Sequence, residues 1–290
     1  MRVKANFVKL NPSGNTTALI LNSFPREDHP RIASEVMKTA SLCVEQAGFL
    51  ERPSLPDAAA RLQMMGGEFC GNASRGFAAW LVHRRFPGIA TNDAGQFVVP
   101  FEASGHTGIL TATVNPNNPE GRYDEAQYYV DLPMPLPKWI RQMNARKDGR
   151  PYTLVEFEGI VHAVAWDITP SEEQFEIIKA DVHQELRGVW EKVDCLGVMF
   201  YDERTQFLTP LVEVEKTGSR VWENSCGSGS AALAAALAER DRKDVNSMRL
   251  TQPGGAIDVA VTWKGRVEEI KIGGNVSIEA EGVVYFDADR

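Results

Sequence analysis

The sequence predicts an α+β protein built from a duplicated unit, and three observations support this. The chain has 290 residues, about the length of two domains. Helix-like and strand-like segments are mixed without the regular alternation that a doubly wound sheet needs. Two cysteine-containing segments, around Cys70 and Cys226, occur at the same point in the order of elements of each half. Their offset, 226 − 70 = 156 residues, is close to half of the chain.

In the first half, hydrophobic periodicity predicts two helices among short strands. Residues 31–46 carry apolar side chains on one face at helical spacing, so we expect a helix that Glu45 ends as a solvated carboxylate. A second helix is expected after Cys70, to about residue 85. The expected strands are residues 3–10, 18–21, 60–69, 97–101 and 108–114.

The second half is expected to repeat this order after a proline-rich crossover at residues 115–137. A helix is predicted from Ser171, as N-cap, to about Asp181, with Gln174 at the capping-box position, and an alanine-rich helix after Cys226. The expected domains are residues 1–130, completed by a C-terminal strand at 275–290, and residues 131–274. The expected strands are residues 152–166 (a hairpin), 196–201, 207–214, 247–250, 257–263, 266–272 and 281–286.

Composition excludes several classes of protein. The net charge of −8 argues against general binding to nucleic acid or an anionic membrane, because both need a basic surface. No apolar run approaches a membrane span, and the first ten residues do not resemble a secretory signal, so we expect a cytoplasmic protein. We expect no metal site, because the histidines lack metal-ligand spacing. They are His29, His83, His106, His162 and His183.

Cys70 and Cys226 are predicted to lie at helix N-termini, because each precedes a glycine, small polar residues and a helix-like run. A free thiol has a pKa of about 8.5. The positive end of a helix dipole favours a nearby anion by up to about 2 kcal/mol, which lowers that pKa by about 1.5. Burial opposes this effect. We therefore expect one thiolate and one thiol that titrate as a coupled pair.

Two such cysteines, brought face to face, can invert a carbon acid. The helix N-termini would bind an amino-acid carboxylate, one thiolate would remove the Cα proton, and the opposite thiol would return a proton to the other face. No cofactor is formally needed. The alternative is a purely structural role, in which both cysteines are buried as small hydrophobic residues. It explains a single cysteine better than two cysteines in matching glycine-rich contexts. Cys43 and Cys195 lack that context and are expected to lie in the core.

The segments Cys-Gly-Asn-Ala at 70–73 and Cys-Gly-Ser-Gly at 226–229 resemble the two half-sites of the cofactor-independent amino-acid racemases and epimerases of the diaminopimelate epimerase fold. The resemblance covers essentially the whole chain. It implies two pseudo-symmetric domains, each a curled sheet around a central helix. Diaminopimelate itself is disfavoured as substrate, because the Glu-Arg-Gly segment before the second cysteine and the distal-site asparagine near Met64 are missing.

Five motifs in order are similar to the histidine racemases of staphylopine-type metallophore biosynthesis. That resemblance implies that Cys70 and Cys226 are the acid/base residues and that D-histidine supplies a nicotianamine-like metallophore. It places the substrate at Asn15, Glu45, Gly71, Asn72, Glu223, Gly227 and Ser228, with Glu45 on the imidazole. The motifs lie at residues 11–15, 43–49, 68–73, 222–229 and 252–255.

Two alternatives remain open at this point. One is a racemase or epimerase for another amino acid, such as hydroxyproline, ornithine or glutamate. The other is a thiol redox or ligand-binding protein, since two facing thiols can form a disulfide, although the chain has no Cys-x-x-Cys pair. The expected partner is a small amino-acid substrate, and a homodimer is compatible with this assignment.

Overall fold

The computed structural model describes residues 2–116, 126–146, 149–188, 193–214 and 218–287. The chain forms two compact units, Met1–Pro133 with Gly273–Arg290, and Met134–Ile272. The elements of the first unit are β1 (Arg2–Pro12), β2 (Thr17–Ile20), the 3-10 helix η1 (Arg26–Asp28), α1 (His29–Met37), β3 (Gln46–Glu51), β4 (Arg61–Met64), α2 (Gly71–His83), β5 (Ala90–Thr91), β6 (Phe97–Ala103), β7 (Leu110–Pro116) and β8 (Gln127–Pro133).

The second unit carries the remaining elements, apart from a strand that belongs to both units. Its elements are β9 (Trp139–Asn144), β10 (Pro151–Phe157), β11 (Ile160–Trp166), α3 (Glu172–Glu185), β12 (Cys195–Asp202), β13 (Phe207–Val214), β14 (Ser219–Trp222), α4 (Gly227–Asp241), β15 (Val245–Gln252) and β16 (Gly255–Trp263). The last strand, β17 (Val267–Asp287), begins in the second unit and continues through the first.

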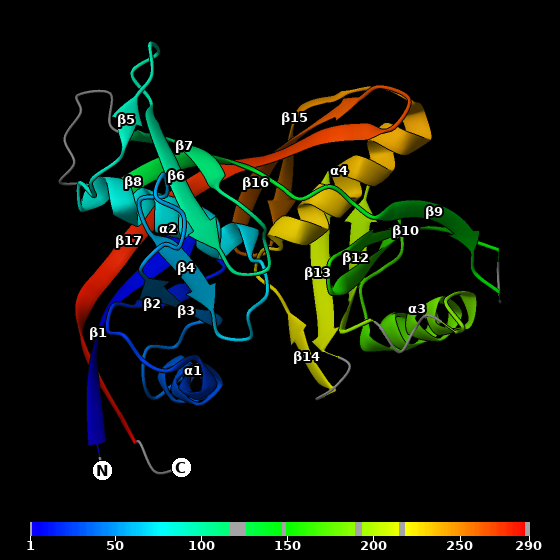
Figure 1. The fold of residues 1–290 in the computed structure, drawn as a ribbon. Coiled ribbons are helices and arrows are strands. Elements are labelled where there is room, and N and C mark those ends of the chain that lie inside the picture. The colour runs from blue at the N-terminus through cyan, green and yellow to red at the C-terminus, as the bar shows by residue number, and fades with distance from the viewer. Residues whose placement is uncertain (1, 117–125, 147–148, 189–192, 215–217, 288–290) are drawn as a thin grey trace. The chain divides into compact units, whose positions relative to one another are not determined.

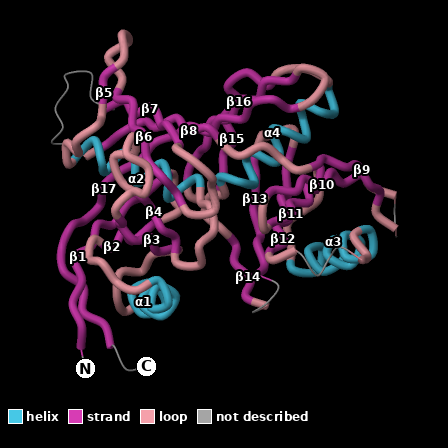
Figure 2. Tube along the Cα trace, in the orientation of Figure 1, coloured by secondary structure: helices cyan, strands magenta, loops and turns pink. Residues whose placement is uncertain are grey.

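Each unit repeats the same succession of strand pairings. In the first unit β1 and β2 pair antiparallel, β3 lies parallel to β2, β4 is antiparallel to β3, and β6 is parallel to β4. In the second unit β10, β11, β12, β13 and β15 repeat these relations in the same order. The parallel strands are connected through α1 in the first unit and through α3 in the second. The second helix of each unit, α2 or α4, comes later in the chain, after β4 or β14 (Figure 2). The predicted duplicated α+β unit is confirmed.

The strands of the first unit close on themselves around α2. The pairings run from β1 through β2, β3, β4, β6, β7 and β8 to β17, which pairs with β1. α2 packs against β1, β2, β6, β7 and β8, and it is buried from Gly71 to Val82 (Figure 1). A helix surrounded in this way is apolar or small on every face. The alanine-rich α4 occupies the equivalent place among β10, β11, β12, β15 and β16.

The prediction of one helix over residues 31–46 is wrong, because α1 ends at Met37. The chain then turns, and the Leu42 N–H donates to the Val36 carbonyl at 3.0 Å. The N–H groups of Glu45 and Gln46 both donate to the Thr16 carbonyl, which starts the parallel pairing of β3 with β2. Glu45 therefore lies at the entry to a strand and not at a helix end.

Three other expectations need correction. The segment at 115–137 contains strand β8, and the expected strands at 266–272 and 281–286 are one continuous strand, β17. Cys43 is exposed and Cys195 is partly exposed, so neither belongs to the core. Cys43 lies in the turn after α1 with a φ of 50°, where no apolar layer covers it.

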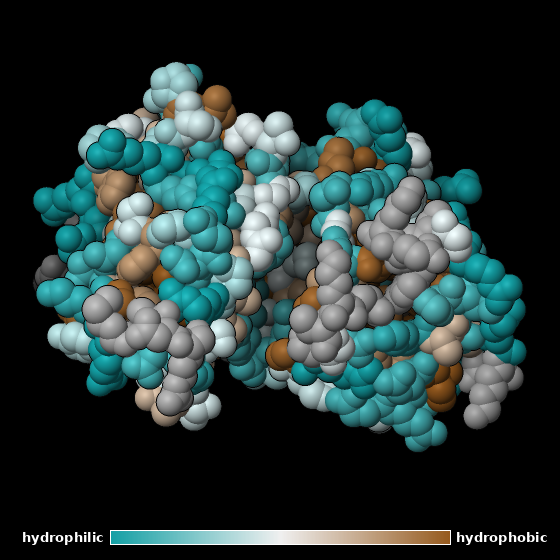
Figure 3. Space-filling view, turned by 60° about the horizontal axis from the view of Figure 1, so that its bottom comes forward, coloured by the Kyte–Doolittle hydropathy of each residue, from teal (hydrophilic) through white to brown (hydrophobic). Residues whose placement is uncertain are grey.

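The visible surface is mainly hydrophilic, with hydrophobic residues showing at scattered places (Figure 3). In the part of the chain that the structure describes, no helix combines the length and apolar composition needed to cross a bilayer. The same residues contain no group of three or more His, Cys, Asp or Glu arranged to hold a metal ion.

Candidate active site

Cys70 caps the N-terminus of α2, as the sequence predicts. Its backbone is extended, with φ −129° and ψ 112°, and its sulfur accepts a hydrogen bond from the Ala73 N–H at 3.4 Å. This is the position and the contact of an N-cap side chain, which satisfies one of the free N–H groups of the first turn. Cys70 is partly exposed.

Cys226 caps α4 in the same way. Its φ and ψ are −120° and 110°, and its sulfur accepts from the Gly229 N–H at 3.3 Å. The Gln252 side chain supports this cap, because its Oε1 accepts from the Cys226 N–H at 2.8 Å and its Nε2 donates to Ser230 Oγ at 2.9 Å. The two predicted catalytic cysteines thus occupy equivalent positions in the two units.

Burial and a carboxylate keep Cys226 protonated. The side chain is 5% exposed. Desolvation raises the pKa of the Cys226 thiol well above its usual value, and the neighbouring Glu223 carboxylate raises it further. Hydrogen bonds from Ser228 and the Gly229 N–H act in the opposite direction but are weaker. In this state of the protein Cys226 is therefore a thiol at neutral pH.

A chain of side-chain hydrogen bonds links Cys70 to Glu45. The Cys70 thiol donates to Gln46 Oε1 at 3.1 Å, and Gln46 Nε2 donates to Asn15 Oδ1 at 2.5 Å. Asn15 Nδ2 in turn donates to Glu45 Oε2 at 2.8 Å. Asn15 and Glu45, predicted as substrate contacts, therefore belong to the same cluster as Cys70. Gln46 was not predicted, because only the β2–β3 pairing brings it to the sulfur.

The first turn of α2 is hydrogen-bonded to Arg75, which is not among the predicted site residues. Asn72, predicted as a substrate contact with Gly71, accepts at Oδ1 from Arg75 Nη2 at 2.7 Å. Both terminal nitrogens of Arg75 also lie 3.4 Å from Ser13 Oγ. The Ser13 N–H and hydroxyl both donate to the Asn275 carbonyl on β17.

The first turn of α4 is tied to a histidine. Ser228, predicted as a substrate contact with Gly227 and Glu223, has its Oγ 3.0 Å from His162 Nε2 and 3.6 Å from Cys226 Sγ. His162 is fully buried, and desolvation lowers its pKa to about 3. The imidazole is therefore neutral under ordinary conditions. Asn15, Glu45, Gly71 and Asn72 thus gather at Cys70 in one unit, and Glu223, Gly227 and Ser228 at Cys226 in the other.

Comparison with known proteins identifies the family. The family model described as the histidine racemase CntK N-terminal domain matches residues 4–285. A histidine racemase from Fusobacterium nucleatum is 33% identical over 282 residues, which cover 97% of this chain and 96% of that protein. The chain belongs to the histidine racemase family. It is an amino-acid racemase, an isomerase, as the sequence predicts.

One further relative agrees with the family, and one solved structure agrees with the fold. A histidine racemase from Staphylococcus aureus is 29% identical over 289 residues, with 97% of each chain covered. The crystal structure of a hydroxyproline epimerase from Agrobacterium vitis, with bound trans-4-hydroxy-L-proline, has a TM-score of 0.66 at 14% identity. That comparison covers 100% of this chain and 95% of the epimerase. The predicted fold, two α+β units of the diaminopimelate epimerase type, is confirmed.

Arg220, which precedes the second cysteine of the racemase, forms ion pairs with carboxylates of its own unit. Its guanidinium donates to Glu172 at 2.6 Å, to Glu176 at 2.5 Å and also to Glu213. The same group lies over the Phe175 ring, 4.2 Å from the centroid. These three carboxylates already balance the charge of Arg220, so the structure gives it a role within its own unit.

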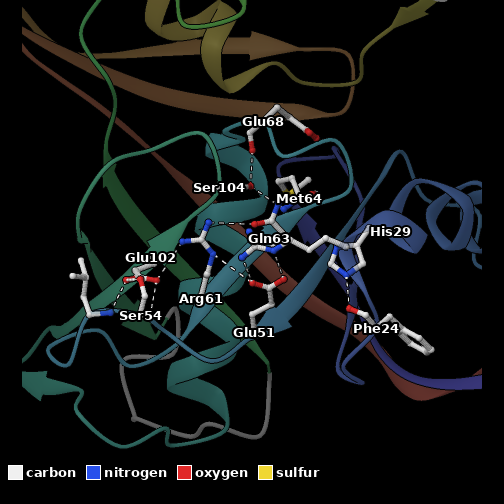
Figure 4. A network of polar contacts seen from close by, with 12 residues as sticks. Phe24, His29, Glu51, Ser54, Arg61, Gln63, Met64, Glu68, Glu102 and Ser104 are labelled. Atoms are coloured by element: carbon white, nitrogen blue, oxygen red, sulfur yellow. Dashed lines mark hydrogen bonds and ion pairs between the residues drawn. The ribbon is translucent and has the colours of Figure 1, made fainter.

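Ser104, the residue that follows β6, supports the segment that leads to Cys70 (Figure 4). The Ser104 hydroxyl accepts from the Met64 N–H at 2.9 Å and donates to the Glu68 carbonyl at 2.7 Å. Beside it Gly105 has a φ of +67°, and a Cβ added there would lie 2.2 Å from the Phe69 nitrogen. The backbone just before Cys70 therefore rests directly on Gly105.

Replacing Gly105 by alanine should destabilise the racemase by more than about 2 kcal/mol, because a left-handed backbone and a backbone clash act together. The racemisation rate should also fall, because the clash displaces the Glu68–Cys70 segment. Urea unfolding and a racemisation assay measure the two effects.

Gly108→Ala is the matched control. Gly108 lies in the same loop with a φ of +87°, but an added Cβ would meet nothing within 4 Å. This variant should lose only about 1 kcal/mol and keep its activity. Equal losses of stability in the two variants would show that the contact with Phe69 carries no weight.

Proposed function

We propose that this racemase interconverts L- and D-histidine by a two-base mechanism in which Cys70 and Cys226 exchange protons with the substrate Cα. The observation that carries the proposal is the repeated cap: in each unit a cysteine sulfur lies at the start of a buried helix and accepts a first-turn N–H. The mechanism requires the two sulfurs to reach opposite faces of one Cα.

The proton balance of the proposed reaction closes without a cofactor. One sulfur, as thiolate, takes the Cα proton and becomes a thiol. The other thiol gives its proton to the opposite face and becomes the thiolate, so the two protonation states are exchanged after each turnover. The raised pKa of Cys226 suits it to be the proton donor in one direction. The N–H groups at Gly71-Asn72 and Gly227-Ser228 stabilise the carboxylate as charge develops on it.

Glu45 is proposed to select histidine. Its Oε2 accepts from Asn15, which places the carboxylate in the Cys70 cluster, and a carboxylate accepts an imidazole N–H and favours the charged ring. The D-histidine formed would serve as a building block of a nicotianamine-like metallophore, as the resemblance to staphylopine-type systems implies.

In D2O the protein should incorporate deuterium at Cα of L-histidine, and the optical rotation of the solution should decay to zero. NMR and polarimetry measure the two events. A parallel panel of hydroxyproline, ornithine and glutamate tests the substrate, and Glu45→Gln should weaken turnover of histidine selectively. Turnover of another amino acid in the panel, with histidine inert, would overturn the histidine assignment.

A further inference from the structure

Arg75 is a buried charge whose place in the fold has no counterpart in the other unit. Its side chain is fully buried within α2. The position five residues after the capping cysteine is Arg75 in α2 and Ala231 in α4. Since α4 forms with alanine there, a helix in this environment does not need an arginine at that position. Arg75 therefore serves something specific to the Cys70 unit.

The contacts of Arg75 join two parts of the candidate site. Its Nη2 donates to Asn72 in the first turn of α2, and both terminal nitrogens lie 3.4 Å from Ser13 Oγ. Ser13 has a φ of 58° and lies two residues before Asn15, which bonds to Glu45. The guanidinium thus fixes the helix start relative to the loop that carries Asn15.

The chemistry of the guanidinium determines how Asn72 is turned. Arginine has five N–H donors and no acceptor, so the Asn72 oxygen must face Arg75 and its NH2 group must point elsewhere. A guanidinium also stays charged at every pH at which proteins fold. Because it is buried, its charge is screened less than a surface charge. It lies behind a helix start that already favours anions.

We propose that Arg75 is a positioning residue for the substrate carboxylate: it holds the first turn of α2 against the Ser13–Asn15 loop and places a permanent positive charge behind the carboxylate position. This inference rests on the proposed function, because it assumes that an amino acid binds at the start of α2. It adds a residue that contacts no substrate atom but sets the affinity for the anionic end of the substrate.

The test compares two ligands by isothermal titration calorimetry: histidine, and histamine, which lacks the carboxylate. Arg75→Met removes the buried charge and its charge-assisted hydrogen bond to Asn72, and should raise the Kd of histidine about 10- to 100-fold while it leaves the Kd of histamine within about twofold. Arg75→Lys, which keeps the charge but not the fork, should fall between the wild type and Arg75→Met. Asn72→Ala added to Arg75→Met should cause less than the product of the two separate losses, because the residues act together.

Arg61→Met is the control for a general loss of stability. Arg61 contacts Glu102, Gln63 and Glu51 within the same unit (Figure 4), and among the described residues none of these polar partners belongs to the Cys70 cluster. This variant should lower the melting temperature and leave the histidine-to-histamine affinity ratio unchanged. If Arg75→Met weakens the binding of histidine and histamine equally, or does not weaken the binding of histidine, the inference is overturned. Failure of the wild type to bind histidine at all would instead refute the proposed function.

Discussion

Replacing Cys70 or Cys226 by serine should lower the racemisation rate about 10²- to 10⁴-fold and leave the fold intact, because each cysteine is an acid/base group of the proposed reaction. A serine hydroxyl is a good N-cap and can accept the same first-turn N–H, so α2 and α4 should keep their caps. The hydroxyl cannot act as a general base at neutral pH, because its pKa is far above that of a thiol. Chiral chromatography measures the rate, and thermal unfolding checks the fold.

The two serine variants should also differ from each other in a specific way. The cysteine that remains can remove a proton from only one face, so each variant should exchange Cα hydrogen with D2O from one enantiomer and not from the other. Cys43→Ser and Cys195→Ser are the matched controls and should retain full activity, since neither residue caps a helix. Racemisation above a tenth of the wild-type rate in either single variant of the pair would refute the two-base mechanism.

The free energy of unfolding should fall between pH 7 and pH 5, and His162 should account for about 2 kcal/mol of the fall. The folded-state pKa of His162, about 3, lies below its ordinary value of 6.5 because burial disfavours the charged ring. A lowered pKa means that the unfolded chain binds the proton first. The stability due to the neutral ring is therefore complete above pH 6.5 and is lost as the pH falls toward 3.

Urea unfolding of the wild type and of His162→Gln at pH 7, 6 and 5 isolates this contribution. Glutamine should remove the histidine part of the slope, so the difference in stability between the two proteins should shrink as the pH falls. His29→Gln is measured in parallel, because His29 is a second buried histidine whose pKa is lowered by burial. Parallel stability curves for the wild type and His162→Gln would show that His162 titrates normally.

Glu102, a buried carboxylate, loses its contribution to stability outside this pH window. Burial by itself would raise the pKa of Glu102, but hydrogen bonds from Ser54, Leu55 and Arg61 together outweigh it and hold the pKa below the usual value. Its contribution to stability is present above the ordinary carboxyl pKa and is lost only as the pH falls below it. Measurements at pH 5 and above therefore separate the His162 effect from the Glu102 effect.

The sequence alone determined the duplicated α+β unit and the two cysteine caps. Both are local features: a cysteine before a glycine, small polar residues and a helix-forming run sets a helix start within one turn. The hairpin at residues 152–166 and the Ser171 cap of α3 were predictable for the same reason. The end of α1 was not, because pairing of β3 with β2 overrides the helical periodicity of residues 38–46.

Only the tertiary structure decided which side chains surround each sulfur. Gln46, His162 and Gln252 reach the two caps through strand pairing and helix packing that join residues distant in the chain. The protonation of Cys226 was decided there as well. A helix start lowers the pKa of a thiol, but the burial of Cys226 and the carboxylate of Glu223 raise it by more. Burial is a property of the folded chain, so no local pattern could have shown the balance.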